Sequence, residues 1–167
     1  QSGSVAIRDK QMAENLKWLL KHKFPNEKII VWAHNSHIVK HPEMMKDTPL
    51  KWKNMGGVFT SDQKLHAQTY VLGFNSRTGT TGRINNDKKF SVNPPVDNSF
   101  ETWIPDTTPY AFVDFKRFRL KNPKGRKPFY MKGLGHWEDI LVWTDHFDGV
   151  FYIRDMYPCT VLEHKRL

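Results

Sequence analysis

The sequence predicts an α/β protein with a mainly parallel sheet, flanking helices and long loops. Three observations predict it: an amphipathic segment at 4–23, a continuous apolar run at 28–33, and later strand-like runs separated by long polar stretches. A helix that leads into a fully apolar strand is half of a βαβ unit, and strands covered on both faces are typical of parallel sheets. The first strand of that unit would precede residue 1, so we expect an incomplete domain that lacks its N-terminal half.

Residues 4–23 have the apolar spacing of an amphipathic helix. Ser4 can cap the first turn, because a serine hydroxyl accepts a hydrogen bond from a free backbone N–H. The apolar positions recur every three or four residues: Val5, Met12, Leu16, Leu19 and Leu20. Pro25 then ends the helix, since proline disfavours helical geometry in the residue before it.

Short strands are predicted in the rest of the chain. Residues 40–66 contain prolines and the pair Gly56-Gly57, which argue against one long helix. Strands are expected where β-branched and aromatic residues gather, at 68–74, 110–115 and 149–154. Residues 75–89 are expected to form a turn-rich loop or hairpin connection. Ser99 is expected to cap a short helix that runs through Glu101.

The composition bounds the class of protein. With 167 residues, eleven Phe, six Trp and five Tyr, the chain can bury one sizeable core but is short for two domains. The formal net charge of +9 comes from scattered Lys and Arg, apart from clusters at 114–127 and 162–167. A basic binder of anionic polymers or nucleic acid is therefore an alternative. No recognition motif accompanies the clusters, so nucleic acid is a disfavoured partner.

Cysteine usage and hydropathy exclude several classes of protein. Cys159 is the only cysteine, so the chain can form neither an internal disulfide nor a four-thiolate metal site. No run of about 18 apolar residues is present, and no membrane span is predicted. No signal peptide is visible in the sequence. Both a cytoplasmic and an exported location stay open.

The segment VWAHNSHIVK, residues 31–40, carries the strongest functional signal. His34 directly follows the apolar run, and His37 comes three residues later, with Asn35 and a serine between them. In open α/β sheets, ligands bind beyond the carboxyl ends of the strands. Because an imidazole is the usual general acid or base near neutral pH, we predict histidine base catalysis with water or a substrate hydroxyl as the attacking group.

Other interpretations of the two histidines stay open. Both rings could simply bond neighbouring loops, since polar groups at the end of a buried strand need partners. A hydrolytic zinc site needs three protein ligands, and the third would have to be His41, His66, Glu101 or a group outside the chain. We therefore expect no metal and no other cofactor. A nucleophilic triad is disfavoured, because no G-x-S-x-G elbow occurs and Cys159 lies in an apolar tail.

Seven ordered blocks of the sequence are similar to one known family. IRDKQMAENLKWL (7–19) and KIIVWAHNSHIVK (28–40) match an Arg-Asp-x-x-Met-x-x-Asn helix and a Trp-Ala-His-Asn-x-His strand end. The later blocks are NMGGVF (54–59), YVLGFNSRTGTTG (70–82), NSFETWI (98–104), FVDFKRF (112–118) and HFDGVFYIRDMYP (146–158). On these blocks the chain resembles the erythromycin esterase family over nearly its whole length, most specifically at the His-Asn-x-His block.

The resemblance implies a hydrolase that opens carboxylic esters such as macrolide lactones with a histidine-activated water, and with it a role in antibiotic resistance. His34 would be a catalytic imidazole and His37 a supporting active-site histidine. Arg8 would bind the substrate or steady the developing oxyanion, and Asn35 and Glu101 would line the pocket. Arg8 could equally be a surface charge, and Glu101 could serve the first turn of a short helix.

The sequence departs from this family in one respect. Family members are longer, and their N-terminal half carries a Gly-Glu-x-x-His motif, whereas this chain has no Gly-Glu pair. We therefore expect residues 1–167 to be the C-terminal part of an erythromycin-esterase-like domain, with 1–3 a cloning remnant or a cut within a longer chain. The isolated chain should hydrolyse little or nothing.

The expected partners follow from the same departure. They are a small-molecule ester, the missing N-terminal half, and a second copy that associates through an exposed apolar face. A small-ligand binding module on the same scaffold, without catalysis, is the alternative function.

Overall fold

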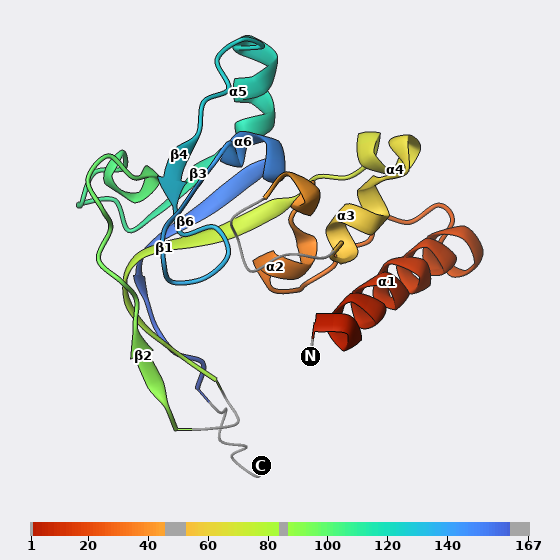
Figure 1. Cartoon of the computed structure of the whole chain (residues 1–167), viewed down its shortest axis with the longest axis horizontal. Helices are drawn as coiled ribbons and strands as arrows, with labels where there is room; N and C mark the ends of the chain where they lie inside the picture. Colours follow the sequence, from red (N-terminus) through yellow and green to blue (C-terminus); the bar gives the residue numbers. More distant parts are fainter. Residues whose placement is uncertain (1, 46–52, 84–86, 161–167) are drawn as a thin grey trace.

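The computed structural model describes residues 2–45, 53–83 and 87–160. Its main sheet has the strand order β2-β1-β6-β3, and β4 and β5 form a separate two-stranded sheet (Figure 1). The strands are β1 (Leu72–Gly82), β2 (Lys89–Ser91), β3 (Tyr110–Val113), β4 (Phe129–Met131), β5 (Asp139–Leu141) and β6 (Gly149–Met156). The α-helices are α1 (Ser2–Trp18), α2 (Asn35–Ile38), α3 (Met55–Thr60), α4 (Gln63–Ala67), α5 (Phe115–Lys121) and α6 (Trp143–His146). One π-helical turn (Leu19–Lys23) and two 3₁₀ turns (Pro42–Met44 and Phe100–Thr102) complete the helical elements of the described ranges.

The predicted α/β class is confirmed, but the predicted mainly parallel sheet is wrong. β1 and β6 are parallel, with Leu72 beside Gly149, whereas β2 pairs antiparallel with β1 and β3 pairs antiparallel with β6. The connection between β1 and β2 is too short for a crossover, so the chain folds back as a hairpin. The result is a mixed sheet with one central parallel pair.

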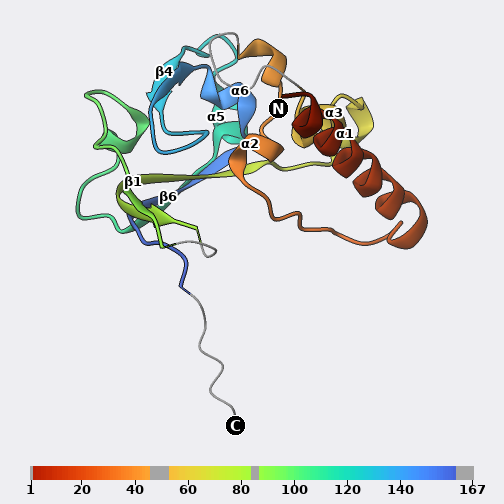
Figure 2. The same ribbon diagram turned by 60° about the horizontal axis from the view of Figure 1, so that its bottom comes forward.

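Residues 28–33, predicted as a buried strand, do not form one. The segment pairs with no strand in the described part of the chain, and Ile30 and Trp32 are 91% and 82% exposed. Figure 2 shows it as an extended ribbon that runs from the end of α1 to α2. A buried parallel strand is paired on its edges and covered on both faces, and the described residues place no strand beside this segment. Its contact with the sheet is the ring of Trp32 against Phe74, with centroids 5.2 Å apart.

The other predicted helices and strands are of the predicted type, but several begin or end at other residues than predicted. The helix predicted over 4–23 is confirmed, since α1 and the π-helical turn together run from Ser2 to Lys23. β1 begins later than predicted and continues to Gly82, through most of the segment predicted as a loop. β3 and β6 confirm the strands predicted near 110 and 149, whereas α5, β4 and β5 were not predicted. The basic cluster at 162–167 lies outside the described residues.

Two apolar clusters hold the short helix α2 in place. The larger lies between the sheet and the elements α5, α6 and β4, and its fully buried side chains include Phe100, Trp143, Phe147, Val150 and Tyr152. The smaller packs α1 against α3 through Ala13, Met55 and Phe59. Gly56 of α3 lies so close to α2 that an added Cβ would be 2.1 Å from the carbonyl oxygen of Ile38. α2 is therefore fixed between α3 and β1 (Figure 1).

In the described ranges, no helix combines the length and the apolar character that a membrane span requires.

Candidate active site

His34 and His37 lie on one turn, at the N-cap and the third residue of α2. His34 is the extended N-cap residue, and its ring is near enough to His37 for that side chain to lower the pKa of His34. Nδ1 of His34 accepts a hydrogen bond from the backbone N–H of Ser36 at 3.2 Å and lies 2.9 Å from the Ser36 hydroxyl. The residue is exposed, and its Nε2 has no partner among the described residues.

His37 is held by two residues of α1. Its Nδ1 lies 2.9 Å from a carboxylate oxygen of Asp9, and its Nε2 lies 3.4 Å from Nη2 of Arg8. The Asp9 side chain is 1% exposed and also accepts a bond from the backbone N–H of Met55, whereas the Arg8 side chain is 60% exposed. Arg8, predicted to bind substrate, is thus brought to the histidine pair. The buried Asp9 was missed, although it follows Arg8 in the block that resembles the family's helix.

Asn35, predicted to line the pocket, bonds backbone groups of two other segments. Its Nδ2 donates to the carbonyl oxygens of Phe74 and Gly133 at 2.6 and 2.8 Å, and its Oδ1 accepts from the N–H of Phe74 at 3.0 Å. The side chain thereby occupies the hydrogen-bonding groups that a neighbouring strand would take from β1. These three hydrogen bonds fix the turn that carries His34 against both β1 and the loop between β4 and β5.

Glu101, the other residue predicted to line the pocket, is buried in the core and has no contact with solvent. It is 0% exposed, and its Oε1 accepts from the side chain of Asn75 at 2.6 Å and from the backbone N–H of Lys132 at 2.8 Å. Its Oε2 is buried without a hydrogen-bond partner in the described part of the chain. Glu101 therefore anchors Lys132 at the start of the β4–β5 loop, and the next residue, Gly133, accepts the bond from Asn35.

The β4–β5 loop brings a third histidine toward the pair. Gly133 accepts the bond from Asn35, and the carbonyl of His136 accepts from the N–H of Asn93 at 3.3 Å. Burial and the nearby Lys132 lower the pKa of His136, and its Nδ1 is buried without a partner among the described residues. His136 is 102 positions from His34 in a stretch without a motif, so no sequence signal could have paired them.

The surroundings of His34 favour a neutral ring. Partial burial is the main cause that lowers its pKa below the ordinary 6.5, although the residue keeps an exposed edge. The nearby side chains of His37, His136 and Arg83 lower the pKa further, because each is or can become a cation. A neutral imidazole near pH 7 is available for hydrogen bonding and proton transfer.

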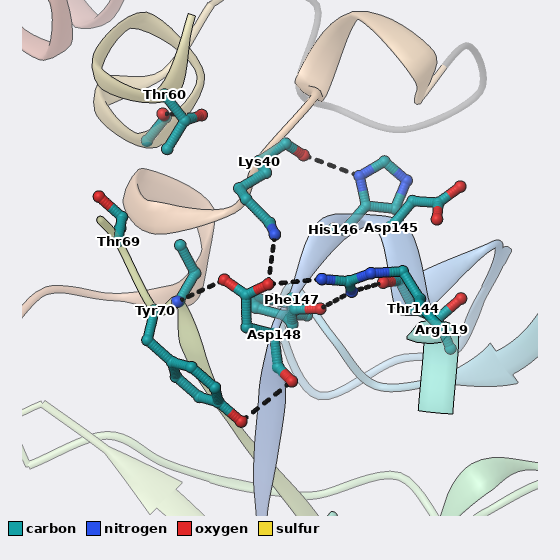
Figure 3. Close-up of polar contacts among 12 residues, drawn as sticks. Lys40, Thr60, Thr69, Tyr70, Arg119, Thr144, Asp145, His146, Phe147 and Asp148 are labelled. Atoms are coloured by element: carbon teal, nitrogen blue, oxygen red, sulfur yellow. Dashed lines mark hydrogen bonds and ion pairs between the residues drawn. The ribbon is translucent and has the colours of Figure 1, made fainter. Parts of the chain in front are cut away.

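A second polar network begins two residues after α2. Nζ of Lys40 and Nη2 of Arg119 both bind Oδ1 of Asp148, at 2.7 and 2.6 Å, while Oδ2 accepts from the N–H of Val71 at 2.9 Å. Arg119 also donates to the carbonyl oxygens of Thr144 and Phe147. Figure 3 shows Lys40 and Arg119 reaching the carboxylate from different elements. Burial alone would raise the pKa of Asp148, but the hydrogen bonds from Lys40, Val71 and Arg119 lower it overall.

Metal ligation was a weak alternative for the histidine pair. No group of three or more His, Cys, Asp or Glu side chains with the geometry of a metal site occurs in the described ranges. The rings of His41 and His66, two of the suggested additional ligands, lie 5.7 Å apart between centroids and are tilted by 59° to each other.

An α/β scaffold that presents one open imidazole beside a second held by a buried carboxylate has the groups of a histidine-dependent hydrolase. The chain belongs to the erythromycin esterase family, whose pattern matches residues 1–156. It is 31% identical over 169 aligned positions to YbfO of Bacillus subtilis (strain 168), a protein whose name calls it a hydrolase. A 40-residue stretch is 45% identical to the erythromycin esterase type II of Escherichia coli, covering 24% of this chain and 10% of that protein. These matches support a hydrolase-like function.

Solved structures agree on the fold. A protein titled as a succinoglycan biosynthesis protein superposes with a TM-score of 0.67 at 17% identity, over 90% of this chain and 38% of the other. A Bacillus cereus protein superposes with a TM-score of 0.66 at the same identity and coverage. The alignment with YbfO covers 96% of this chain and 37% of YbfO. The chain thus spans well under half the length of these relatives.

Proposed function

We propose that this chain carries the histidine-bearing part of an ester hydrolase site, in which imidazole-assisted attack of water opens a carboxylic ester of the macrolide lactone type. The observation that carries the proposal is the His34–His37 turn. One ring has a free, exposed nitrogen, and the other is oriented by a buried carboxylate. Family membership supports the ester as substrate class.

Water attack on an ester needs two kinds of group. A base must take the proton of the water, and a donor must stabilise the charge that develops on the carbonyl oxygen. The two imidazoles and the exposed guanidinium of Arg8 offer both kinds within one turn of α2 and the facing turn of α1. In this proposal Arg8 contacts the substrate, while Asn35 and Glu101 hold the surrounding backbone.

The partner in this proposal is the part of the whole protein that corresponds to the unmatched length of the relatives. It would cover Ile30 and Trp32, which are exposed and apolar along an extended segment that leads to His34. Burying two side chains of this size contributes on the order of 3–6 kcal/mol. The same segment would otherwise drive association between copies of the chain.

The test compares ester hydrolysis by this chain, by the whole protein, and by the whole protein with His34→Ala. We expect measurable turnover only in the whole protein, and a loss of about a hundredfold or more in kcat for His34→Ala, with an unchanged circular dichroism spectrum. His22→Ala, in the exposed π-helical turn that follows α1, is the matched control. A His34→Ala protein that keeps the wild-type rate would refute the proposed function.

A further inference from the structure

The hydrogen bonds of His34 fix the position of its proton. Nδ1 lies 3.2 Å from the backbone nitrogen of Ser36. A backbone N–H can only donate, so Nδ1 must accept with its lone pair. The neutral ring then carries its proton on Nε2, the nitrogen without a partner among the described residues. The Ser36 hydroxyl at 2.9 Å agrees, because its hydrogen can rotate to donate to the same nitrogen.

The hydrogen bonds of His37 fix the opposite tautomer. Nδ1 lies 2.9 Å from Oδ2 of Asp9, and an ionised carboxylate can only accept. In the neutral ring Nδ1 therefore carries the proton, and Nε2 has a lone pair. Arg8 supports this assignment independently, since its guanidinium can only donate and its Nη2 lies 3.4 Å from that nitrogen.

We infer that the two imidazoles divide the proposed ester hydrolysis between them: Nε2 of His37 takes the proton of the attacking water, and Nε2–H of His34 donates to the ester carbonyl oxygen. The inference rests on the proposed function and refines it. It makes His37 the general base, whereas the sequence had suggested His34 for catalysis and His37 for support. Asp9 is the positioning residue of His37.

The reaction balances with these groups. The water oxygen bonds to the carbonyl carbon as its proton moves to Nε2 of His37, and the carbonyl π electrons move to the oxygen held by His34. When the tetrahedral intermediate collapses, the bond from carbon to the alcohol oxygen breaks. The proton on His37 then passes to the leaving alcohol, and the acid product keeps the oxygen of the water.

The environment of each ring suits its role. Partial burial and the neighbouring His37, His136 and Arg83 lower the pKa of His34, and the neutral ring still donates from Nε2–H to a developing oxyanion. A buried carboxylate on Nδ1 is the group that orients a histidine base. The contact of Arg8 with His37 is long, and the Arg8 side chain is mostly exposed. It can therefore turn toward a substrate and leave the lone pair of His37 to a water.

The proton positions can be measured in this chain without any activity. Imidazole ¹⁵N chemical shifts of the histidine-labelled protein at pH 7.5 separate a protonated from an unprotonated ring nitrogen. We expect His34 with an unprotonated Nδ1 and His37 with a protonated Nδ1, and Asp9→Asn to alter the His37 pattern alone. A protonated Nδ1 on His34, or an unprotonated Nδ1 on His37, would overturn the inference and leave the proposed function standing.

The roles can be separated by glutamine substitutions in the whole protein. His34→Ala should lower kcat by about 10²–10³, and His34→Gln should recover most of that loss because its amide still offers an N–H. His37→Gln should lose about 10²–10⁴ and recover nothing, because an amide is no base. His22→Gln is the control. A His34→Gln protein as slow as His34→Ala, or an active His37→Gln protein, would contradict the division of roles. A wild-type protein without ester hydrolysis would refute function and roles together, whatever the tautomers.

Discussion

The two ends of α2 lead into opposite kinds of polar site. At its C-terminal side, Lys40 and Arg119 close on Asp148, and the two side chains of the Lys40–Asp148 pair are 2% and 4% exposed. At its N-terminal side, His34 is exposed and has one ring nitrogen without a partner among the described residues. His37 contacts the long, mostly exposed side chain of Arg8. The first network has a protein partner for each carboxylate oxygen, and the second keeps hydrogen-bonding capacity for something else. The buried network therefore fixes α2 against the rest of the protein, and α2 in turn presents His34 and His37 at its other end.

The hydrogen bonds among Lys40, Arg119 and Asp148, called the closed network below, hold the chain after α2 against the sheet. Lys40 exchanges two further bonds with His146, from its N–H to the His146 carbonyl at 3.0 Å and from Nδ1 of His146 to its own carbonyl at 2.8 Å. Asp148 also accepts from Val71, where β1 approaches β6. One carboxylate therefore joins the chain after α2, the start of β1 and helix α5 (Figure 3).

The largest effect is expected on removing the carboxylate of the closed network. Asp148→Ala leaves two cations without their partner, one of them buried, and should lower the free energy of unfolding by about 3–5 kcal/mol. Urea denaturation followed by circular dichroism measures it. Asp106→Ala is the matched control, because that carboxylate pairs with Arg77 at 2.7 Å but is 76% exposed. A cost for Asp148→Ala no greater than that of Asp106→Ala would contradict the comparison.

A smaller change in the free energy of unfolding is expected when the pH is lowered, because His146 is buried beside Lys40. Burial lowers the pKa of His146 below its ordinary 6.5, although the bond to the Lys40 carbonyl opposes the shift. The unfolded chain therefore binds a proton near pH 6.5 that the folded chain resists, so stability is full above that pH and falls as the pH drops below it. His34 and His136 have lowered pKa values as well and act in the same direction.

Urea denaturation between pH 7.5 and 5.5 measures this effect. The free energy of unfolding should fall over that range, and His146→Gln should reduce the fall while lowering stability at pH 7.5. A stability that is constant, or that rises as the pH decreases, would show that burial does not hold His146 neutral in the folded chain.

The sequence indicated which residues meet at the open site better than it indicated what supports them. His34 and His37 were expected at a strand end and lie on a short helix instead, and Arg8, suggested by the family resemblance, lies beside His37. The Asp148 pairing with Lys40 joins residues 108 positions apart, and His136 reaches the site on a loop that no motif marks. Such contacts depend on how β1, β6 and the β4–β5 loop pack. Local patterns do not encode that packing.

In the fold, too, elements with a local sequence signal were predicted and elements that depend on distant partners were not. α1 followed from its apolar spacing, because that signal is local to the helix. The run 28–33 has the composition of a buried strand, but composition cannot supply the strands that would lie beside it. β1 runs past Gly79 and Gly82 because it pairs with β6 and β2, which outweighs the turn signals of that segment.

We expect the ligand to bind at the N-terminal end of α2, beside His34 and His37. A crystal structure of the whole protein with a phosphonate analogue of an ester would show where it binds. A phosphonyl oxygen is expected about 2.7–3.1 Å from Nε2 of His34, with Nε2 of His37 facing the phosphorus from the side of attack. An analogue bound away from α2, or a His34 whose Nε2 is bonded to protein instead, would contradict it.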